Sequence, residues 1–475
     1  MVSTTFSIAA RVNSRGQDQF SVDPSNGFLP REAPLVELPS EYAAMESLLR
    51  RMSLLQPDGS DGLLVTGEFG AAVDRELPEY DLSHVTDTRL LSALYRDLTF
   101  VASAYLLEPC DLQFRRSGSY GLGRQVLPRN IAVPLSVVAH KIGAKPFMEY
   151  ALSYALYNYR KIEQSKPLGF DNLALVRGFS NDVDERGFIL VHVSMVSHSG
   201  ALVSASLKCL EAVETGDRQA FNAAMADVCT AYGHINDVME TMWNRSAPEK
   251  YLGYRTFIMG TKNQPMFPNG VLYEGVSDQP FKMRGESGAN DSMVPLGDNL
   301  LELTAHMPSN PLTEVLRDFR SYRPRNHRLF LEFVQRRANT LGLRDFACAD
   351  ANSAALYLAN LDMVRAFRHR HWLFTKEYII KRTAHPVATG GSPIVTWLPN
   401  QLATVLNTMV ATSEGIQRDA LTAENRALVD SISKRADAQR RVLTREVARL
   451  VQQRGVQASQ VDAVEKDAAT ASVTV

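Results

Sequence analysis

The sequence predicts a mostly α-helical protein. Along most of the chain, apolar residues recur three and four positions apart, which is the spacing of one face of an α-helix. Alternating patterns typical of strands are confined to two short candidates, 257–259 and 271–273. Hydrophobic residues make up 45% and charged residues 22% of the 475 residues, so the chain has enough apolar surface for a large core.

Charge and cysteine content argue against several classes of function. The chain has 51 Lys and Arg against 52 Asp and Glu, whereas a nucleic-acid-binding protein needs a basic surface. The cysteines are Cys110, Cys209, Cys229 and Cys348. Because none of them forms a C-x-x-C pair, we expect neither a disulfide framework nor a cysteine zinc site.

Targeting signals are weak. No run of about 18 or more apolar residues predicts a membrane span, and no apolar segment near residue 1 predicts secretion. We therefore expect a cytoplasmic protein with no membrane partner. A mitochondrial presequence is the alternative, because no acidic residue precedes Asp18.

An arm and a small helical domain are expected first. Residues 1–40 are rich in Pro, Ser, Gly and Asn, which is typical of irregular chain. Helical spacing begins at 45–52 and recurs at 90–101. We place the small N-terminal domain at 41–145.

A large helical domain is expected at 146–410. Its helical patterns lie at 148–159, 188–213, 220–244, 299–303, 328–340 and 354–382. The segment 188–213 is apolar on nearly all sides, which predicts one long buried helix. The segments 260–292 and 385–399 are rich in Gly, Pro, Asn and Ser, and loops of this length usually carry function.

Residues 411–475 are expected to form a charged amphipathic helix and a tail. An apolar stripe runs through 421–450, and small residues prevail from 468 onward. Such a stripe packs on its own chain or on a second copy, so the spacing fits a monomer or a homodimer.

One histidine lies on an apolar helical stripe. Steps of three and four residues connect Val364, Phe367, His371, Phe374 and Tyr378. His371 therefore faces the core, and His369 faces away from it. Arg368, on the same side, needs an anion nearby. A haem would supply iron for the imidazole and a propionate for the guanidinium, whereas a histidine simply packed in the core is the alternative.

His192 is a second histidine in apolar surroundings. It stands beside Val191 and Met195, and the run 197–201 that follows is dominated by small residues. These small residues fit two interpretations equally well. They allow a flat group to approach the backbone, or they form a close helix-packing face.

Five sequence blocks follow one another in a characteristic order. They are RQVLPRNIAVP at 124–134, Arg255 followed by NGVLYEG at 269–275, RGESGANDS at 284–292, DFRSYRPRNHR at 318–328, and 371–378 followed by TGGS at 389–392. In sequence and order they resemble the indoleamine 2,3-dioxygenase family, over about residues 40–410. One block alone would be weak support, whereas five in order are a specific signal.

The resemblance implies a fold and a cofactor. It implies an all-α, indoleamine 2,3-dioxygenase-like fold with a small N-terminal domain and a large helical domain that binds haem b. His371 then matches the proximal ligand of the haem iron, and Arg368 matches the arginine that pairs with a haem propionate. Ser287 and Gly288 match the loop that closes over the haem.

The resemblance also implies a reaction. Both atoms of O2 are inserted across the indole C2–C3 bond of L-tryptophan or a related indoleamine, giving N-formylkynurenine, and a reductant keeps the iron ferrous. Arg255 matches the arginine that grips the substrate carboxylate, a task suited to its bidentate fork. Phe188 matches an aromatic residue of the distal pocket. Thr389 and Gly390 match a mobile loop that closes on the substrate ammonium.

Several positions depart from the family pattern. His192 replaces a small hydroxyl residue of the vertebrate enzymes. Related tryptophan 2,3-dioxygenases place a histidine in the distal pocket, bonded to the indole N–H, and we assign His192 this role as a hypothesis. Lys250 and Tyr251 stand where the family has two aromatic residues, and Tyr251 remains a substrate-binding candidate. Glu286 replaces a glycine, and its charge needs a partner or an edge position.

Three alternative functions remain open at this stage. The protein could be a haem-dependent monooxygenase of another aromatic amino acid, a non-catalytic haem protein that binds O2, or a helical interaction protein without haem. Arg255 and the segment 389–392 favour an amino-acid substrate, because an oxygen carrier needs no clamp for a carboxylate.

Overall fold

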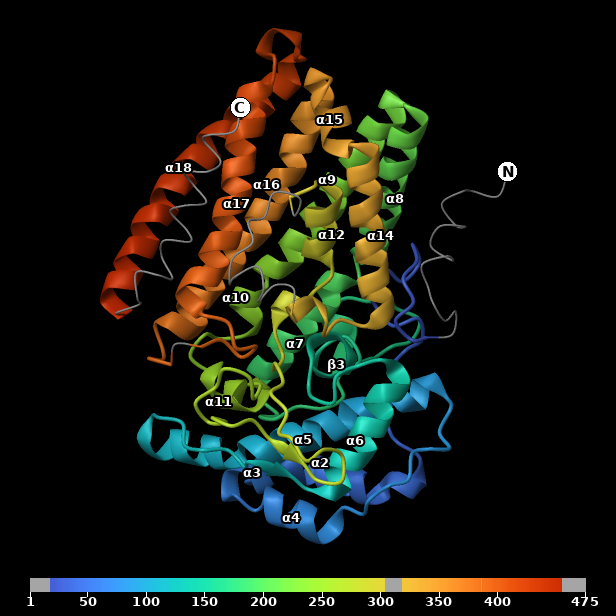
Figure 1. The fold of residues 1–475 in the computed structure, drawn as a ribbon, viewed down its shortest axis with the longest axis vertical. Coiled ribbons are helices and arrows are strands. Elements are labelled where there is room, and N and C mark those ends of the chain that lie inside the picture. The colour runs from blue at the N-terminus through green and yellow to red at the C-terminus, as the bar shows by residue number, and fades with distance from the viewer. Residues whose placement is uncertain (1–17, 304–317, 386, 455–475) are drawn as a thin grey trace.

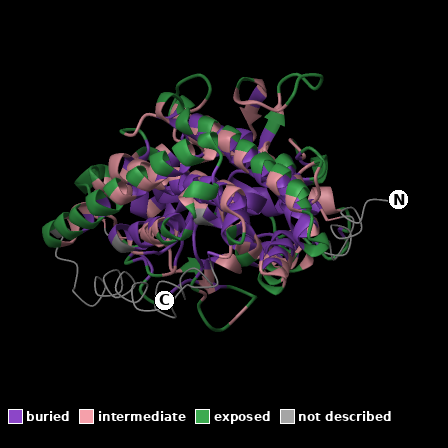
Figure 2. Ribbon diagram, turned by 90° about the horizontal axis from the view of Figure 1, so that it is seen from above, coloured by how far each residue is buried: buried purple, intermediate pink, exposed green. Residues whose placement is uncertain are grey.

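The computed structural model describes residues 18–303, 318–385 and 387–454 (Figure 1). Helices dominate, which confirms the all-α prediction. Seen from above, buried residues fill the centre and exposed residues form the rim (Figure 2). Residues 1–17, which begin the predicted arm and carry the alternative presequence, and the tail from 468 lie outside the described residues, so these predictions remain untested.

The first helices lie together at the lower end of the molecule in Figure 1. They are α2 (Ala43–Met52), α3 (Leu63–Thr66), α4 (Phe69–Glu76), α5 (Thr88–Ser117) and α6 (Arg129–Ile142). The side chain of Asp87 accepts the amides of Arg89 and Leu90 and so begins α5, and Gly118 ends it in the left-handed conformation at φ 73°. The division into a small domain at 41–145 and a large domain after it stays a prediction.

The remaining α-helices, long and short, lie above this layer in Figure 1, with α11 (Leu252–Arg255) directly over it. They are α7 (Val183–Val196), α8 (Ser199–Thr215), α9 (Arg218–Glu240), α10 (Met242–Arg245), α11, α12 (Met293–Leu300), α14 (Arg325–Leu341), α15 (Leu343–Cys348), α16 (Ala351–Phe374), α17 (Ile394–Gly415) and α18 (Ala423–Arg454). A π-helical turn, η6 (Thr375–Ile380), continues α16 after Phe374, within one turn of His371. The predicted helix at 354–382 is thus one continuous element with a change of pitch.

Strands are few and short. β1 (Val126–Leu127) pairs in parallel with β4 (Leu272–Tyr273), and β2 (Tyr159–Lys161) pairs antiparallel with β3 (Leu173–Leu175). The strand candidate at 271–273 is confirmed. The candidate at 257–259 is wrong, because it lies mostly in the 3-10 turn η4 (Thr256–Ile258); a short buried apolar run does not distinguish the two.

The predicted helix at 188–213 is interrupted. It divides into α7 and α8 at Ser197 and His198. The N-terminal arm passes close to this break, because the Ser199 hydroxyl accepts the Phe28 amide at 2.9 Å. A Cβ on Gly200 would lie 2.6 Å from the Pro24 carbonyl oxygen. The small residues at this break therefore make room for the arm, a contact that neither interpretation had named.

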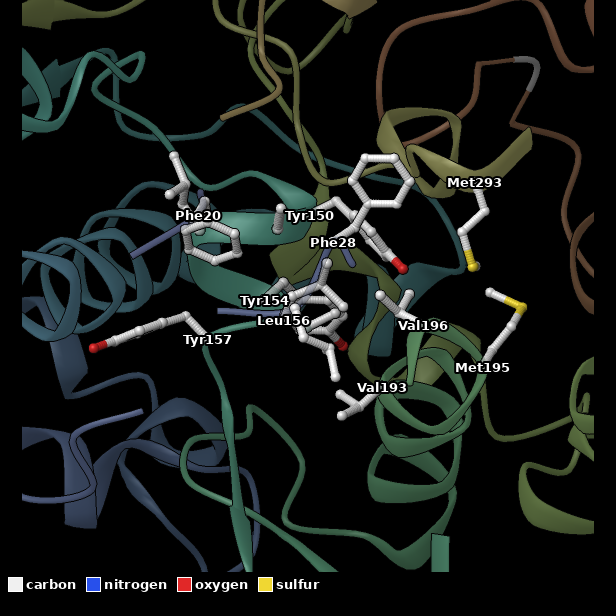
Figure 3. Close-up of a cluster of buried hydrophobic side chains, with 14 of the residues drawn as sticks. Phe20, Phe28, Tyr150, Tyr154, Leu156, Tyr157, Val193, Met195, Val196 and Met293 are labelled. Atoms are coloured by element: carbon white, nitrogen blue, oxygen red, sulfur yellow. The ribbon is translucent and has the colours of Figure 1, made fainter. Parts of the chain in front are cut away.

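The predicted helix at 148–159 is also largely wrong. A single π-helical turn, η2 (Tyr150–Tyr154), replaces it before β2 begins. Its aromatic rings join a buried cluster with side chains of the arm and α7, drawn in Figure 3. Tyr150 and Tyr154 lie there beside Met195 and Val196, so this core fixes the position of α7.

The C-terminal stripe packs on its own chain. Ile432, Ala436, Leu443 and Val447 of α18 are buried, and α18 runs against α16 and α17 in Figure 1. Of the two outcomes left open by the spacing, the structure shows packing within one chain.

Two helical segments of the described chain are long and apolar enough to cross a membrane, Thr88–Ser117 and Val183–Thr215. Inside the fold, 94% and 67% of their most apolar stretches are buried. This is how core helices of a globular protein behave, and it explains why their composition resembles that of a span.

Candidate active site

A cavity of about 1090 Å³, its open mouth included, lies among α7, α16 and α17. Its wall is mainly apolar and aromatic, as in small-molecule sites generally. The apolar and aromatic members are Phe188, Val191, Met195, Met239, Met242, Tyr251, Phe367, Phe374, Tyr378, Ile379, Ala388, Pro393, Ile394, Trp397 and Leu398. The polar members are His192, Glu286, Ser287, Asp291, His371, Thr375, Thr389 and Ser392, and Gly288 adds a stretch of backbone.

His371 reaches the cavity from α16. It shares the wall with Phe367, Phe374 and Tyr378, the residues of the predicted stripe. Burial and the nearby His192 lower the pKa of His371 to about 4, so its imidazole is neutral, the form that binds a metal. His369 is not part of this wall.

His192 reaches the same cavity from α7. Its Nδ1 lies 2.8 Å from the carbonyl oxygen of Phe188, one turn earlier. A carbonyl only accepts, so Nδ1 carries the proton and Nε2 is left as an acceptor. Burial lowers the pKa of His192 and keeps this neutral form. The Phe188 and Tyr150 rings lie 5.0 and 5.7 Å from the imidazole.

Arg255 is a buried cation with unused donors. It ends α11, and its Nη2 donates to the Val387 carbonyl at 2.9 Å. Among the described residues its Nε and Nη1 have no hydrogen-bond partner, although the residue is 0% exposed, and Arg255 itself is not part of the cavity wall. A buried guanidinium in this state calls for an anion, and a carboxylate matches its fork. Tyr251, one turn earlier, forms part of the cavity wall.

The loop that contains Thr389 and Gly390 is docked over the cavity. Side chains from the segment 260–292 and α11 hold its backbone carbonyls at four positions: Arg255 on Val387, Gln264 on Ala388, Arg284 on Gly390, and Asn263 on Gly391. The Thr389 carbonyl accepts the amide of Gly260 at 2.9 Å. The loop approaches its neighbours closely, since a Cβ on Gly390 would lie 2.5 Å from the Phe319 ring.

Arg368 lies behind the wall rather than in it. Its Nη2 donates to Asp298 Oδ2 at 2.6 Å, and its Nη1 donates to the Gln401 carbonyl at 3.2 Å. The anion that the sequence requires near this arginine is therefore supplied by the protein. Its pairing with a haem propionate stays a prediction.

The segment 284–292 carries Ser287 and Gly288 into the wall. A Cβ on Gly288 would lie 4.0 Å from His192 Nε2, so this backbone faces the distal histidine. Two acids of the segment also reach the cavity, Glu286 and Asp291. Sequence reasoning noted the departure at Glu286 but assigned neither acid a role in the site.

The aromatic pair expected before Arg255 is reduced to one member. Tyr251 is buried and packs 5.3 Å from the Phe188 ring and 5.7 Å from the Tyr378 ring. Lys250 is exposed and contributes nothing to the wall. At this point the wall therefore carries the phenol of Tyr251, and the charge of Lys250 stays outside the cavity.

The donor set suits an iron that is held mainly by another group. No three His, Cys, Asp or Glu side chains of the described chain converge on one point. Two neutral histidines nevertheless face one apolar cavity, from α7 and α16. The residues thus fit a flat macrocycle whose iron takes one imidazole, with room for a second molecule beside it.

Fold and site together define an all-α protein with two neutral histidines in the wall of one apolar cavity and a buried guanidinium on α11 that keeps two donors unpaired among the described residues. The model of one family, described as indoleamine 2,3-dioxygenase, matches residues 16–416. The chain belongs to this family of haem-dependent oxidoreductases.

Known relatives cover most of the chain at low identity. Indoleamine 2,3-dioxygenase 1 of Mus musculus is 27% identical over 364 residues, 76% of this chain and 84% of the relative. Indoleamine 2,3-dioxygenase of Saccharomyces cerevisiae is 27% identical over 384 residues, 76% and 80% of the two chains. A 6-hydroxytryptophan 2,3-dioxygenase of Fusarium equiseti is 25% identical over 374 residues, 76% and 85%. α18 lies beyond the end of the family match.

Proposed function

We propose that this protein is a haem-dependent dioxygenase that inserts both atoms of O2 across the indole C2–C3 bond of L-tryptophan or a related indole amino acid. The product is N-formylkynurenine or its substituted analogue. The observation that carries the proposal is Arg255, a buried guanidinium with two nitrogen atoms that have no hydrogen-bond partner among the described residues; Tyr251, one turn earlier, lines the apolar cavity that also holds His371. An amino-acid carboxylate would satisfy that guanidinium.

Four residues would hold the cofactor. His371 would bind the iron through its neutral imidazole, while Ser287 and Gly288 would line one face of the ring. Arg368, which Asp298 fixes behind the wall, would contribute its positive charge toward a propionate. Haem, when bound, supplies the iron chemistry that activates O2.

The protein would orient the substrate from several directions. Arg255 binds the carboxylate, Phe188 packs on the indole ring, and Tyr251 closes the aromatic wall. Thr389 and Gly390 approach the ammonium when their loop is docked, and the docked loop excludes water. A dry cavity strengthens each polar contact.

His192 would contribute the contact to the indole nitrogen. Its Nε2 is the free acceptor of the neutral ring, and an indole N–H is a donor only. The wild-type enzyme is then expected to turn over L-tryptophan much faster than 1-methyl-L-tryptophan, and His192→Ala reduces this ratio. Equal turnover of both substrates by the wild type would contradict this role.

The setting proposed for this activity is the cytoplasm, with a cellular reductant that keeps the iron ferrous. The packing of α18 on its own chain is compatible with a monomer, and a homodimer through another surface is the alternative.

The test combines a visible spectrum with a turnover assay. Haem-loaded, reduced protein is mixed with L-tryptophan in air, and N-formylkynurenine is measured. Product that is lost in His371→Ala and strongly reduced in Arg255→Ala supports the proposal. A spectrum that shifts with tryptophan without this product would indicate a monooxygenase or another aromatic substrate. Reversible O2 binding that tryptophan does not affect would instead indicate an oxygen carrier. Failure to take up haemin would indicate an interaction protein without haem.

A further inference from the structure

A second pocket opens beside α12 and α14, apart from the cavity described above. It measures about 690 Å³, its open mouth included, and it shares no lining residue with the cavity that holds His371. Arg320, Arg323 and Arg328 contribute to its wall, the first two from the segment just before α14 and the third from α14 itself. We call it the arginine pocket.

Arg328 has no partner among the described residues. Its Nε is buried and donates no hydrogen bond to them, and its guanidinium forms no ion pair with them. Glu332, one turn further along the helix, lies 3.7 Å from Arg336 Nη1 instead. A buried donor without a partner is unfavourable, and a bound acceptor would remove this penalty.

Arg323 is a second cation in the wall, and it is 2% exposed. Its Nε donates to the carbonyl oxygens of Asn290 and Asp291, at 3.3 and 3.2 Å. Burial and the nearby charge of Arg320 lower the pKa of Arg323 to about 10, although Asp291 and Asp298 act in the opposite direction. Two guanidinium groups thus lie close enough to repel each other at one pocket, an arrangement that an anion in the pocket would stabilise.

The rest of the wall suits an oxyanion that has an organic part. Asn299, Ser321 and Gln335 add amide and hydroxyl groups, and Leu331 adds apolar surface. Glu332 is the one carboxylate among the lining residues, against three guanidinium groups. The fork of a guanidinium matches the paired oxygen atoms of a phosphate or a carboxylate, and three such groups favour a ligand with more than one negative charge.

We propose that the arginine pocket binds a small multivalent oxyanion, such as an organic phosphate or a polycarboxylate, at a site separate from the cavity around His371. The arginines of its wall bind the charged oxygen atoms, and Leu331 contacts the carbon skeleton. The inference does not depend on the proposed dioxygenase activity, because no residue of the arginine pocket takes part in that activity.

Arg323 connects this pocket to the wall of the other cavity. The carbonyl of Asp291 accepts its Nε, and Asp291 itself lines that cavity. The Asp291 carboxyl group also accepts the amides of Met293 and Val294 at the start of α12, at 3.0 and 3.1 Å. Anion binding should therefore slow hydrogen exchange in the segment 290–294. Slower exchange confined to other segments would place the anion elsewhere and contradict the inference.

Calorimetric titration of the full-length, haem-loaded protein is the main test. The probes are pyrophosphate and citrate, at an ionic strength held constant with sodium chloride. Arg328→Gln should weaken binding by about tenfold or more, because it removes a charge-assisted contact. Glu332→Gln should strengthen binding, because it removes the one carboxylate of the wall. Tighter binding of pyrophosphate indicates a phosphate ligand, and tighter binding of citrate indicates a polycarboxylate.

Arg325→Gln is the matched control. Arg325 lies on the same helix, is exposed and does not line the arginine pocket. The substitution changes the net charge of the protein exactly as Arg328→Gln does. It should leave the affinity for both probes within about twofold of the wild-type value, since exposed charges act weakly at a distance in salt.

Three results of the titrations would overturn the inference. The first is no measurable affinity for either probe at millimolar concentrations. The second is an equal effect of Arg328→Gln and Arg325→Gln, because the anion would then respond only to overall charge. The third is binding to haem-free protein that haem abolishes, because the anion would then occupy the place of a haem propionate.

Discussion

At the scale of single residues, the site depends on polar groups that folding leaves unpaired in an apolar wall. Among the described residues, Arg255 keeps two nitrogen atoms without partners, and the charged group that acts on the buried Glu286 carboxyl is another acid, Glu149. Each costs folding free energy until a ligand pairs with it. Residues of this kind are therefore the ones whose substitution separates binding from stability.

Arg255 serves both the substrate and the loop above it, and the two roles can be separated. Arg255→Ala should lower kcat/KM for L-tryptophan by about 30-fold or more, since a hydrogen bond to a charged group contributes about 2 kcal/mol. Tryptamine has no carboxylate, so the same substitution should lower kcat/KM for tryptamine much less. Steady-state kinetics with both substrates checks this.

Gln264→Ala is the control for the loop. It removes the 2.8 Å bond to the Ala388 carbonyl without removing the guanidinium. Its effect should be similar for L-tryptophan and tryptamine. Equal losses for the two substrates in Arg255→Ala would mean that the arginine acts only by holding the loop.

The acid pair of Glu149 and Glu286 gives stability a defined pH dependence. Burial raises the pKa of both groups from 4.5 to about 8, so between these values the folded protein binds more protons than the unfolded chain. Stability must then fall as pH rises through this window, by up to about 1.4 kcal/mol per pH unit for one proton. Thermal unfolding at pH 5 to 8 should show a smaller decline for Glu286→Gln than for the wild type. Parallel curves would show that Glu286 titrates normally.

At the scale of elements, the periodicity of apolar residues correctly predicted the helices whose surroundings stay the same along their length. The stripe of α16 placed His371 correctly in the cavity wall, because steps of three and four residues define one face. The helix at 188–213 was predicted as one element because α7 and α8 are both buried and apolar. Their break depends on the arm contacting Ser199 from 171 positions away, and local periodicity carries no such information.

α18 was recognised as a helix from its stripe, but its structural role was not. Glu446 accepts Trp372 Nε1 at 2.8 Å and Lys376 Nζ at 2.6 Å, one donor on each side of the junction between α16 and η6. Trp372 is 1% exposed, so its N–H cannot turn to water. Glu446→Ala should lower the free energy of unfolding by about 1–3 kcal/mol and weaken haem retention. Urea unfolding and haem transfer to apomyoglobin measure the two effects.

An exposed ion pair on the same helix provides the control. Asp437 and Arg440 are each 45% exposed in their side chains, so Asp437→Ala should change stability by less than about 0.5 kcal/mol. Similar losses in both variants would mean that α18 contributes only general helix stability. A loss confined to Glu446→Ala would assign the effect to its contacts with α16.

At the scale of the whole molecule, the cavity is assembled from segments that are remote in sequence. The wall draws on 188–195, 239–251, 286–291, 367–379 and 388–398. Resemblance to a family brought candidates from most of these segments together, whereas composition and spacing alone singled out only the two histidines. Pairings such as Arg368 with Asp298, or Arg255 with the Val387 carbonyl, depend on tertiary packing and have no local signal.

This assembly predicts that haem stabilises distant parts of the protein together. A ligand that binds only the folded state adds about 2.7 kcal/mol at 100 times its dissociation constant. Because the ligand would contact α7, α16 and the segment 284–292, hydrogen exchange in all three should slow together when haemin is added to apoprotein. The helices α2 to α4 contribute nothing to the cavity wall and serve as the internal control. His371→Ala should lose most of the protection in every segment. Protection restricted to α16 would mean that the segments fold independently and that the cavity closes without its cofactor.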